Sequence, residues 1–198
     1  MRKVPLQIQK RLCAAADLFA DNGLNDSKIE DVAAVTGVPK ATLYYYFSGK
    51  EEILAFLLGD LLKDIADAVA AIVHTDGTGA ERLELVIRTQ LRAMAQRPGV
   101  CRALIGELGR AGRMPVIAEM INTACQQPVE ALLVAGAHDG SLVKQPDARS
   151  TSIALFGAVT ISALMYLITA NNLDETAVAS TLNALMFDGL RPREGDKR

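Results

Sequence analysis

Residues 29–54 (IEDVAAVTGVPKATLYYYFSGKEEIL) constrain the fold of this chain more than any other stretch. Apolar residues recur at helical spacing in two short segments, which a turn at Gly37 separates and a long third segment follows. Glycine can adopt the positive φ of a tight corner, and Pro39 suits a first helical turn, where no backbone donor is lost. This order predicts a helix-turn-helix, a motif whose second helix enters the major groove of DNA.

Two capping boxes give the expected helix boundaries. Ser27 with Glu30 predicts a helix start at Lys28, and Ser48 with Glu51 predicts another start only a few residues after the second helix. The second helix of the motif is therefore expected to have two turns at most.

The outward face of that second helix carries side chains suited to DNA. Leu43 and Phe47, at i and i+4, are expected to anchor the helix and leave the other residues exposed. Lysine and threonine can contact phosphates or base edges, tyrosine hydroxyls can donate to phosphates, and helix starts favour anions. The predicted DNA-contacting residues are Ser27, Lys28, Lys40, Ala41, Thr42, Tyr44, Tyr45 and Lys50.

Net charge does not by itself indicate a nucleic-acid partner. The chain has a formal charge of −2, and residues 1–52 contain seven basic and seven acidic residues. DNA binding must therefore depend on where the charges lie rather than on their sum, which predicts modest non-specific affinity and a moderate salt dependence.

With these residues in place, the sequence resembles a known family. AAADLFADNG at residues 14–23, the TGV turn, KATLYYYF and the following K-E pair resemble the N-terminal domain of TetR-family transcriptional regulators. The resemblance is close over roughly the first 55 residues, and the remainder matches in length, helicity and helix order. It implies a helix-turn-helix over 28–47, with phosphate contacts from Tyr44, Tyr45 and Lys50. Pro39 and Tyr46 stand where such proteins often have serine and histidine.

The whole chain is expected to be all-α, with about nine helices. Half of its 198 residues are hydrophobic, and Ala, Leu, Glu and Arg dominate the periodic stretches. We expect a three-helix DNA-binding domain over 1–52 and a helical bundle for ligand binding and dimerisation over 53–198. A first helix should run from Pro5 to Gly23. Later helices are expected at about 50–73, 81–96, 100–109, 115–134 with an interruption near Pro128, 147–170 and 174–188, with a loop at 135–147.

The segment from Ser150 to Leu173 has no charged residue and is long enough to span a bilayer. Small residues recur at every fourth position from Ser150 to Ser162, as in closely packed membrane helices. Several Ser, Thr and Asn residues dilute the apolarity, and no basic cluster or aromatic belt brackets the segment. Burial in protein is the favoured alternative to a membrane-tethered regulator. No signal peptide is expected at the basic N-terminus, so we expect a cytoplasmic protein without a membrane partner.

A dimer is the expected functional form. One short recognition helix reads only a few base pairs, and a two-fold axis can present two such helices to major grooves about 34 Å apart. The family resemblance implies that the last two helices of each subunit form the interface. The predicted interface residues are Phe156, Val159, Ala163, Tyr166, Val178, Leu182, Leu185 and Met186.

Catalytic and metal-binding motifs are absent from the sequence. The three cysteines have no CxxC spacing, and the two histidines are not paired, so no metal, cofactor or enzymatic activity is expected. Cys13 is interpreted as a small core residue. Cys101 stands at an expected helix start beside Arg102, a position that favours thiolate, so a thiol-based redox sensor is an alternative function. A buried free cysteine is the favoured interpretation of this residue.

A small-molecule effector is the favoured regulatory hypothesis, because the region after residue 55 exceeds what DNA presentation requires and helical bundles hold ligands between helices. The low aromatic content, 5%, favours an aliphatic or amphipathic ligand. The predicted ligand-contacting residues are Arg88, Leu91, Arg92, Met94, Leu104, Glu107, Met114, Ile117, Met120, Asn122 and Phe156. A DNA-binding protein that does not respond to a ligand remains the other alternative.

Overall fold

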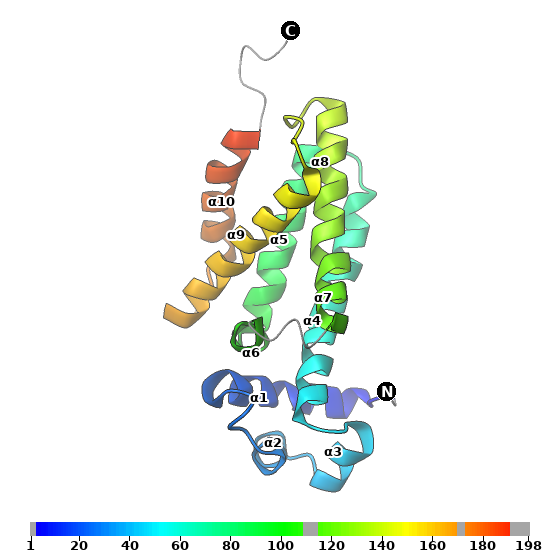
Figure 1. The fold of residues 1–198 in the computed structure, drawn as a ribbon, viewed down its shortest axis with the longest axis vertical. Coiled ribbons are helices and arrows are strands. Elements are labelled where there is room, and N and C mark those ends of the chain that lie inside the picture. The colour runs from blue at the N-terminus through cyan, green and yellow to red at the C-terminus, as the bar shows by residue number, and fades with distance from the viewer. Residues whose placement is uncertain (1–2, 109–114, 170–172, 191–198) are drawn as a thin grey trace. The chain divides into compact units, whose positions relative to one another are not determined.

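The computed structural model describes residues 3–108, 115–169 and 173–190, and every regular element within them is a helix (Figure 1). The chain divides into two compact units. Unit 1 consists of Met1–Leu61 and Arg97–Ala118, and unit 2 consists of Leu62–Gln96 and Glu119–Arg198.

Unit 1 contains the predicted DNA-binding motif. Its elements are α1 (Leu6–Asn22), α2 (Ile29–Thr36), α3 (Lys40–Tyr46), the first half of α4 (Lys50–Val73), α6 (Pro98–Leu108) and the start of α7 (Pro115–Ile121). The core is built from apolar side chains of α1 to α4, among them Leu12, Phe19, Leu43, Phe47 and Ile53, all nearly excluded from solvent. Helix α1 packs against both α2 and α6.

Two features hold α6 on α1 within unit 1. Gly99 lets the helices approach so closely that a Cβ at this position would overlap the carboxylate of Asp17. Arg102 then donates to Asp17 Oδ1 at 2.9 Å and lies 3.6 Å from Asp21 Oδ1. A further ion pair, Arg97 to Asp60 at 2.8 Å, joins the residue before α6 to α4.

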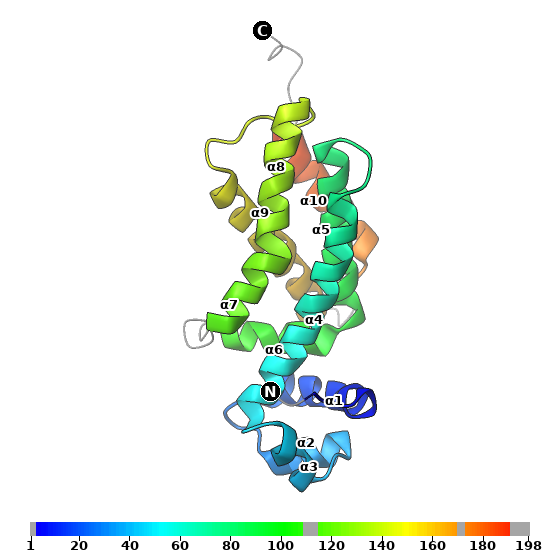
Figure 2. The same cartoon turned by 90° about the vertical axis from the view of Figure 1, so that its right-hand side faces the viewer.

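Unit 2 is a helical bundle. It contains the second half of α4, α5 (Gly79–Gln96), the π-helical turn η2 (Asn122–Gln126), α8 (Gln127–Asp139), α9 (Ala148–Thr169) and α10 (Glu175–Leu190). Helix α5 packs against α8, α9 and α10, and Figure 2 shows α8 running alongside α5. Polar pairs join α5 to α10 at two levels, Asn183 to Glu84 at 2.5 Å and Arg92 to Glu175 at 3.1 Å.

The crossing of α5 and α8 depends on two glycines. A Cβ on Gly79 would overlap the backbone N and Cα of Gly136 and would lie 2.9 Å from the carbonyl oxygen of Leu132. The buried side chain of Leu142 occupies the space beside Gly136, and Asp139 Oδ2 accepts a hydrogen bond from Gly79 N at 2.7 Å. The two helices therefore touch backbone to backbone at this point.

Pro128 explains the irregular turn between α7 and α8. Proline has no N–H, so the carbonyl four residues earlier loses its normal helical partner. The chain adopts a π turn there, in which the N–H of Gln127 bonds to the carbonyl of Asn122, five residues back. When α7, η2 and α8 are taken as one continuous rod, the described residues contain nine helical rods, as predicted.

Most predicted boundaries agree with the structure to within two residues, and the fourth helix agrees at both ends. Three details were wrong. Helix α8 continues to Asp139, so residues 135–139 are not loop. The N-cap of α2 is Lys28, whose backbone N–H bonds to Asp31 at 2.9 Å, rather than Ser27. Before α4, the N–H and hydroxyl of Ser48 bond to Glu52 rather than to Glu51.

The division into units also differs from the predicted boundary at residues 52 and 53. The first unit extends to Leu61 and includes Arg97–Ala118, a stretch assigned from sequence to the ligand-binding domain.

Helix α9 has the length and hydropathy to cross a membrane, and among the described residues no other helix meets both conditions. About 39% of the most apolar 18-residue stretch of α9 is buried within the chain, including Leu155, Val159 and Leu164.

Candidate functional site

A network of backbone and side-chain hydrogen bonds fixes the turn between α2 and α3. Gly37 has φ 62°, the left-handed conformation that glycine adopts without a steric cost. The buried hydroxyl of Thr36 donates to the carbonyl of Val32 at 2.6 Å and accepts from the N–H of Val38 at 3.2 Å. Arg11 on α1 donates to the carbonyls of Thr36 and Gly37. The angle between the two helices of the motif is thus set by the turn itself and by α1.

Helix α3 is anchored on one side and exposed on the other. Leu43 and Phe47 are buried, as their spacing predicted. Tyr44 and Tyr45 are 55% and 57% exposed, large fractions for aromatic side chains. The outward face of α3, with Lys40 and Ala41 also exposed and Thr42 half-buried, remains available to a ligand as large as DNA.

Two of the predicted DNA-contacting lysines also have partners within unit 1. Lys40 forms an ion pair with Glu30 on α2, and this hydrogen bond lowers the pKa of the Glu30 carboxyl and raises the pKa of the Lys40 ammonium. Lys50 Nζ donates to the carbonyl oxygens of Asn25 at 2.7 Å and Ser27 at 2.9 Å. Lys50 therefore ties the start of α4 to the segment before α2, so two donors of its ammonium are already used.

Among the predicted DNA-contacting residues, Ser27 is the one whose side chain is buried. Its side chain is 1% exposed, and its hydroxyl donates to the carbonyl of Gly23 at 2.8 Å. Serine at this position closes the turn after α1, while the neighbouring Lys28 is exposed and caps α2.

A hollow of about 500 Å³ lies between α3 and the starts of α2 and α4. Four of the predicted DNA-contacting residues line it, namely Ser27, Lys28, Tyr44 and Lys50. Asp26 and Glu51 also line it. These carboxylates offset part of the positive charge, which agrees with the electroneutral composition of residues 1–52.

The predicted ligand-contacting residues fall into four groups. Leu91 and Met94 in unit 2 and Ile117 in unit 1 are buried. Met120, Asn122 and Phe156 in unit 2 and Leu104 in unit 1 are half-buried. Arg88 and Arg92 are exposed on α5 and pair with Glu84 and Glu175, so both lie on a solvated face. Glu107 and Met114 lie outside the residues whose side chains the structure describes.

Sequence reasoning missed one buried polar residue of unit 2. Gln90 on α5 is 4% exposed, and its Nε2 has no hydrogen-bond partner among the described residues. Its signal in the sequence is an uncharged polar residue at helical spacing from buried Val86, Ile87 and Met94. A buried amide donor without a partner is costly, so Gln90 Nε2, like Asn183 Oδ1 in the same unit, is a polar atom available to a bound molecule.

Half of the predicted dimer residues are not on the surface. Val159, Ala163, Val178 and Leu182 are buried in the core of their own subunit, because α9 and α10 pack against α5. Tyr166 and Leu185 are exposed, Phe156 is half-buried, and the side chain of Met186 lies outside the described residues.

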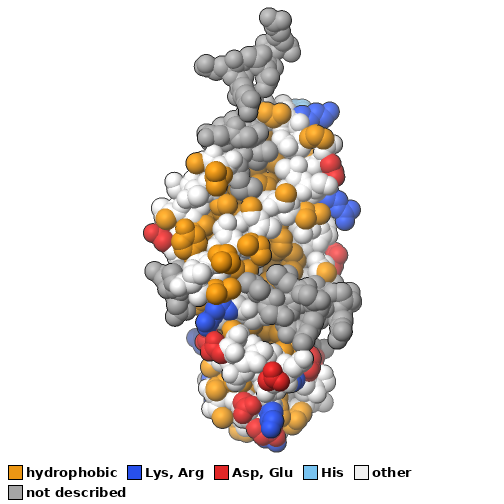
Figure 3. All heavy atoms as spheres, turned by 60° about the vertical axis from the view of Figure 1, so that its left-hand side comes forward, with side chains coloured by type: hydrophobic (Ala, Val, Ile, Leu, Met, Phe, Trp, Pro, Cys, Tyr) orange, Lys and Arg blue, Asp and Glu red, His pale blue; other side chains and the backbone are white. Residues whose placement is uncertain are grey.

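A different row of residues forms the exposed face of α9. Ile161, Met165 and Ile168 lie at i, i+4 and i+7, each about half exposed, and Ala154 shares their face. Figure 3 shows apolar side chains gathered over the part of the surface where α9 and α10 lie.

Cys101 does not have the environment expected of a reactive thiol. It is buried, and burial raises the pKa of its thiol to about 12, although the nearby Arg97 acts in the opposite direction. Cys125 is buried with the same consequence. Cys13, interpreted from sequence as a core residue, is exposed on α1. Cys101 is therefore the buried free cysteine that the sequence favoured over a redox sensor, whereas the interpretation of Cys13 as a core residue was wrong because its side chain is exposed.

Thiol labelling will check this assignment. At neutral pH we expect iodoacetamide to modify Cys13 in the folded protein and all three cysteines after unfolding, because the thiolate is the reactive form and burial suppresses it at Cys101 and Cys125. Mass spectrometry of the peptides measures each site. Rapid modification of native Cys101 would restore the redox interpretation.

Comparison with known proteins agrees with the geometry of unit 1. Residues 12–56 match the family model described as bacterial regulatory proteins, tetR family. The chain is 22% identical to the fatty acid metabolism regulator protein of Bacillus subtilis over 180 residues, which cover 89% of this chain and 92% of that protein. It is 28% identical over 130 residues to the HTH-type transcriptional repressor KstR2 of Rhodococcus jostii, covering 64% and 63% of the two chains.

Solved structures share the fold over nearly the full length. The crystal structure of the transcriptional regulator FadR from Bacillus subtilis in complex with stearoyl-CoA superposes with a TM-score of 0.76 at 21% identity, covering 93% of this chain and 98% of that one.

Proposed function

We propose that this chain, which belongs to the TetR family of transcriptional regulators, is a repressor that binds a palindromic operator as a homodimer and is released by a small apolar or amphipathic effector. The relatives are transcriptional regulators rather than enzymes, and the proposal involves neither a catalytic step nor a cofactor. The proposed location is the cytoplasm, where a bacterial operator is accessible.

The exposed face of α3 is the single observation that carries the DNA-binding proposal. This short helix buries Leu43 and leaves more than half of the Tyr44 and Tyr45 side chains exposed to solvent. Their hydroxyls suit phosphate oxygens, and Lys40, Ala41 and Thr42 precede them along the same helix. Lys28, at the N-terminus of α2, supplies a further positive charge beside Tyr44.

A dimer follows from the size of the recognition helix and from the apolar face of α9. Seven residues of helix read too few base pairs for useful specificity, whereas two copies read a palindrome. The exposed Ile161, Met165 and Ile168 provide an uncharged surface that a second copy can bury.

Effector control is supported by unit 2 and by the relatives. FadR of Bacillus subtilis was solved with stearoyl-CoA, and KstR2 of Rhodococcus jostii is a repressor. An effector that binds the DNA-incompetent state more tightly shifts the population toward that state. Helix α4 belongs to both units, and α6 of unit 1 follows α5 of unit 2 directly. These continuous segments are the proposed route by which a change in unit 2 alters α3.

Tyr44 provides the sharpest test of the DNA interface. Tyr44→Ala and Lys40→Ala are each expected to weaken binding to a fragment of the protein's own promoter by about 10-fold, since one good contact contributes about 1–3 kcal/mol. Fluorescence anisotropy at fixed salt measures the affinity. The matched control is Lys63→Ala, which removes an exposed positive charge from unit 2. Unchanged affinity in both α3 variants would refute the DNA-binding proposal.

A further inference from the structure

The ion pair between Glu30 and Lys40 joins the two helices of the helix-turn-helix. Glu30 lies in the first turn of α2, and Lys40 is the first residue of α3. The hydrogen bond between them lowers the pKa of the Glu30 carboxyl and raises the pKa of the Lys40 ammonium, so both side chains are charged at neutral pH. Both are accessible to a ligand, since 48% of the Lys40 side chain and 56% of the Glu30 side chain are exposed.

Stability does not account for this pair. Exposed ion pairs contribute little to folding, because side-chain entropy and solvent screening offset most of the attraction. The start of α2 is already capped, since Asp31 accepts a hydrogen bond from the N–H of Lys28. The turn between the helices is already fixed by Thr36 and by Arg11. Neighbouring residues therefore define the local fold without the Glu30 side chain.

A carboxylate at this place opposes binding to most DNA sequences. The N-terminal residues of a recognition helix lie nearest the base edges, so the partner of Lys40 is carried toward the groove with it. A carboxylate there repels phosphates and occupies a lysine that would otherwise bind one. Its charge is compensated only where the groove offers a hydrogen-bond donor. Such a residue favours the sequences that supply this donor over all others.

The spacing of the two charged groups matches the major-groove edge of one base pair. In a charge-assisted hydrogen bond, the nitrogen and oxygen atoms lie about 2.7–2.9 Å apart. Guanine O6 and cytosine N4 are themselves joined by a hydrogen bond, with a spacing of about 2.9 Å. The Lys40 ammonium can therefore face O6 while the Glu30 carboxylate faces N4. Lysine with guanine and glutamate with cytosine are both established pairings of direct readout.

The other three base pairs fit these two groups less well. With the base that faces Lys40 written first, C·G and A·T place an amino donor against the ammonium and a carbonyl acceptor against the carboxylate. T·A keeps one acceptor and one donor in place. However, thymine has a methyl group where guanine has the acceptor N7, and adenine N7 lies beside the carboxylate. The expected order of affinity is therefore G·C, then T·A, then the other two.

We infer that Glu30 is a specificity-determining residue that, together with Lys40, reads one G·C base pair in each operator half-site. The carboxylate accepts from cytosine N4, and the ammonium donates to guanine O6 and N7. The inference rests on the proposed function, and it adds a residue of α2 to the base contacts and the identity of one base pair. Glu30 was not among the DNA-contacting residues expected from the sequence.

The experiment uses the full-length protein and its promoter fragment, in which each base pair of the protected site is changed in turn to the other three. Fluorescence anisotropy at fixed salt measures the affinity for each duplex. The base pair that Lys40 reads is the one at which Lys40→Ala loses discrimination. Wild-type protein should favour G·C there by about 10-fold or more over C·G and A·T. In Glu30→Gln the preference for G·C over T·A should fall to about twofold or reverse, because glutamine also pairs with adenine.

Non-operator DNA provides a second readout. Glu30→Gln should bind a duplex of unrelated sequence about fivefold more tightly and steepen the slope of log affinity against log salt by about 0.9, because Lys40 becomes available to a phosphate. Glu30→Asp keeps the charge but withdraws it by one methylene, so it should lose the base preference while its non-specific affinity stays low. A purely structural role of Glu30 would change neither the base preference nor the salt slope.

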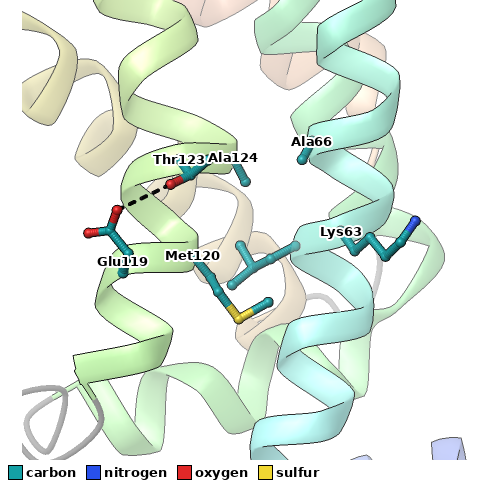
Figure 4. A pocket seen from close by; sticks show the side chains of 7 residues that line it. Lys63, Ala66, Glu119, Met120, Thr123 and Ala124 are labelled. Carbon is teal, nitrogen blue, oxygen red and sulfur yellow. Dashed lines mark hydrogen bonds between the residues drawn. The ribbon is translucent and has the colours of Figure 1, made fainter. Parts of the chain in front are cut away.

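Two control variants remove a carboxylate elsewhere. Asp31→Ala removes the cap of α2 in the same turn and should weaken binding to all sequences by the same factor. Asp67→Asn breaks a second exposed ion pair, with Lys63 one turn away on α4 in unit 2, and should leave every affinity unchanged. Figure 4 shows Lys63 at the edge of the groove between α4 and the α7–η2 segment, extending away from the opposite wall.

The outcomes separate this inference from the proposed function. Base preferences in Glu30→Gln that equal those of wild type at every position would overturn the inference and leave the repressor proposal standing. An equal gain for all sequences would mean that Glu30 only screens Lys40 from phosphates, and an equal loss would mean that it only supports α2; either result overturns the assignment. Absence of binding by wild-type protein to its promoter fragment refutes the proposed function itself.

Discussion

Replacing Gly79 by alanine is expected to lower the free energy of unfolding by about 3 kcal/mol and the Tm by about 10 °C. The new Cβ would overlap backbone atoms of Gly136, and backbone cannot rotate away as a flexible side chain can. The α5–α8 crossing would have to widen, which would disturb Leu132 and Leu142, both buried beside it. Calorimetric or circular dichroism melting of the purified variant measures the effect.

Gly140→Ala is the control for that measurement. Gly140 ends α8 with φ 75°, and a Cβ added there would meet no other atom within 4 Å, so alanine should cost only the backbone term of about 1 kcal/mol. Equal losses of unfolding free energy in Gly79→Ala and Gly140→Ala would show that the close approach of α5 and α8 does not contribute to the cost.

Ile161→Arg is expected to convert the protein to monomers and to weaken operator binding by about 100-fold or more. Ile161 lies at the centre of the exposed apolar row on α9. In a two-fold interface an arginine at this position would lose its hydration or lie close to the same arginine of the partner subunit, and both effects oppose association. Because α9 contacts α5 and α8 through its other faces, the subunit itself should remain folded. Sedimentation measures the oligomeric state, and anisotropy with the promoter fragment measures the affinity.

The matched control is Val134→Arg, which introduces the same charge at a comparably exposed valine on α8. A dimer that persists in Ile161→Arg, or one that is lost equally in Val134→Arg, would contradict the assignment of this face.

Long periodic helices were predictable from the sequence, because glycine and proline mark their ends. The sequence did not decide between Ser27–Glu30 and Lys28–Asp31, which have the same three-residue spacing. Capping statistics favour serine, but the Ser27 hydroxyl already bonds to Gly23, and Lys28 needs only its backbone N–H to reach Asp31.

The faces of α9 show a second limit of sequence reasoning. A helix that is apolar all round has no polar stripe to reveal which side meets its own core. Val159 and Ala163 were therefore indistinguishable from Ile161 and Met165 until the packing against α5 and α8 was known. The arginines of α5 show the same limit, because nothing in the periodicity of Arg92 indicates that Glu175 is its partner.

The placement of α6 has a consequence for how such a protein can change. The polypeptide crosses between the units three times, after Leu61, Gln96 and Ala118. A single recombination event near residue 61 would thus combine the α1 of this protein with the α6 of another. The residues of that α6 at the positions of Gly99 and Arg102 would then not be matched to Asp17. New sensory specificities should arise by drift within the bundle, or by exchanges that carry α1 and α6 together, more readily than by simple shuffling of two halves.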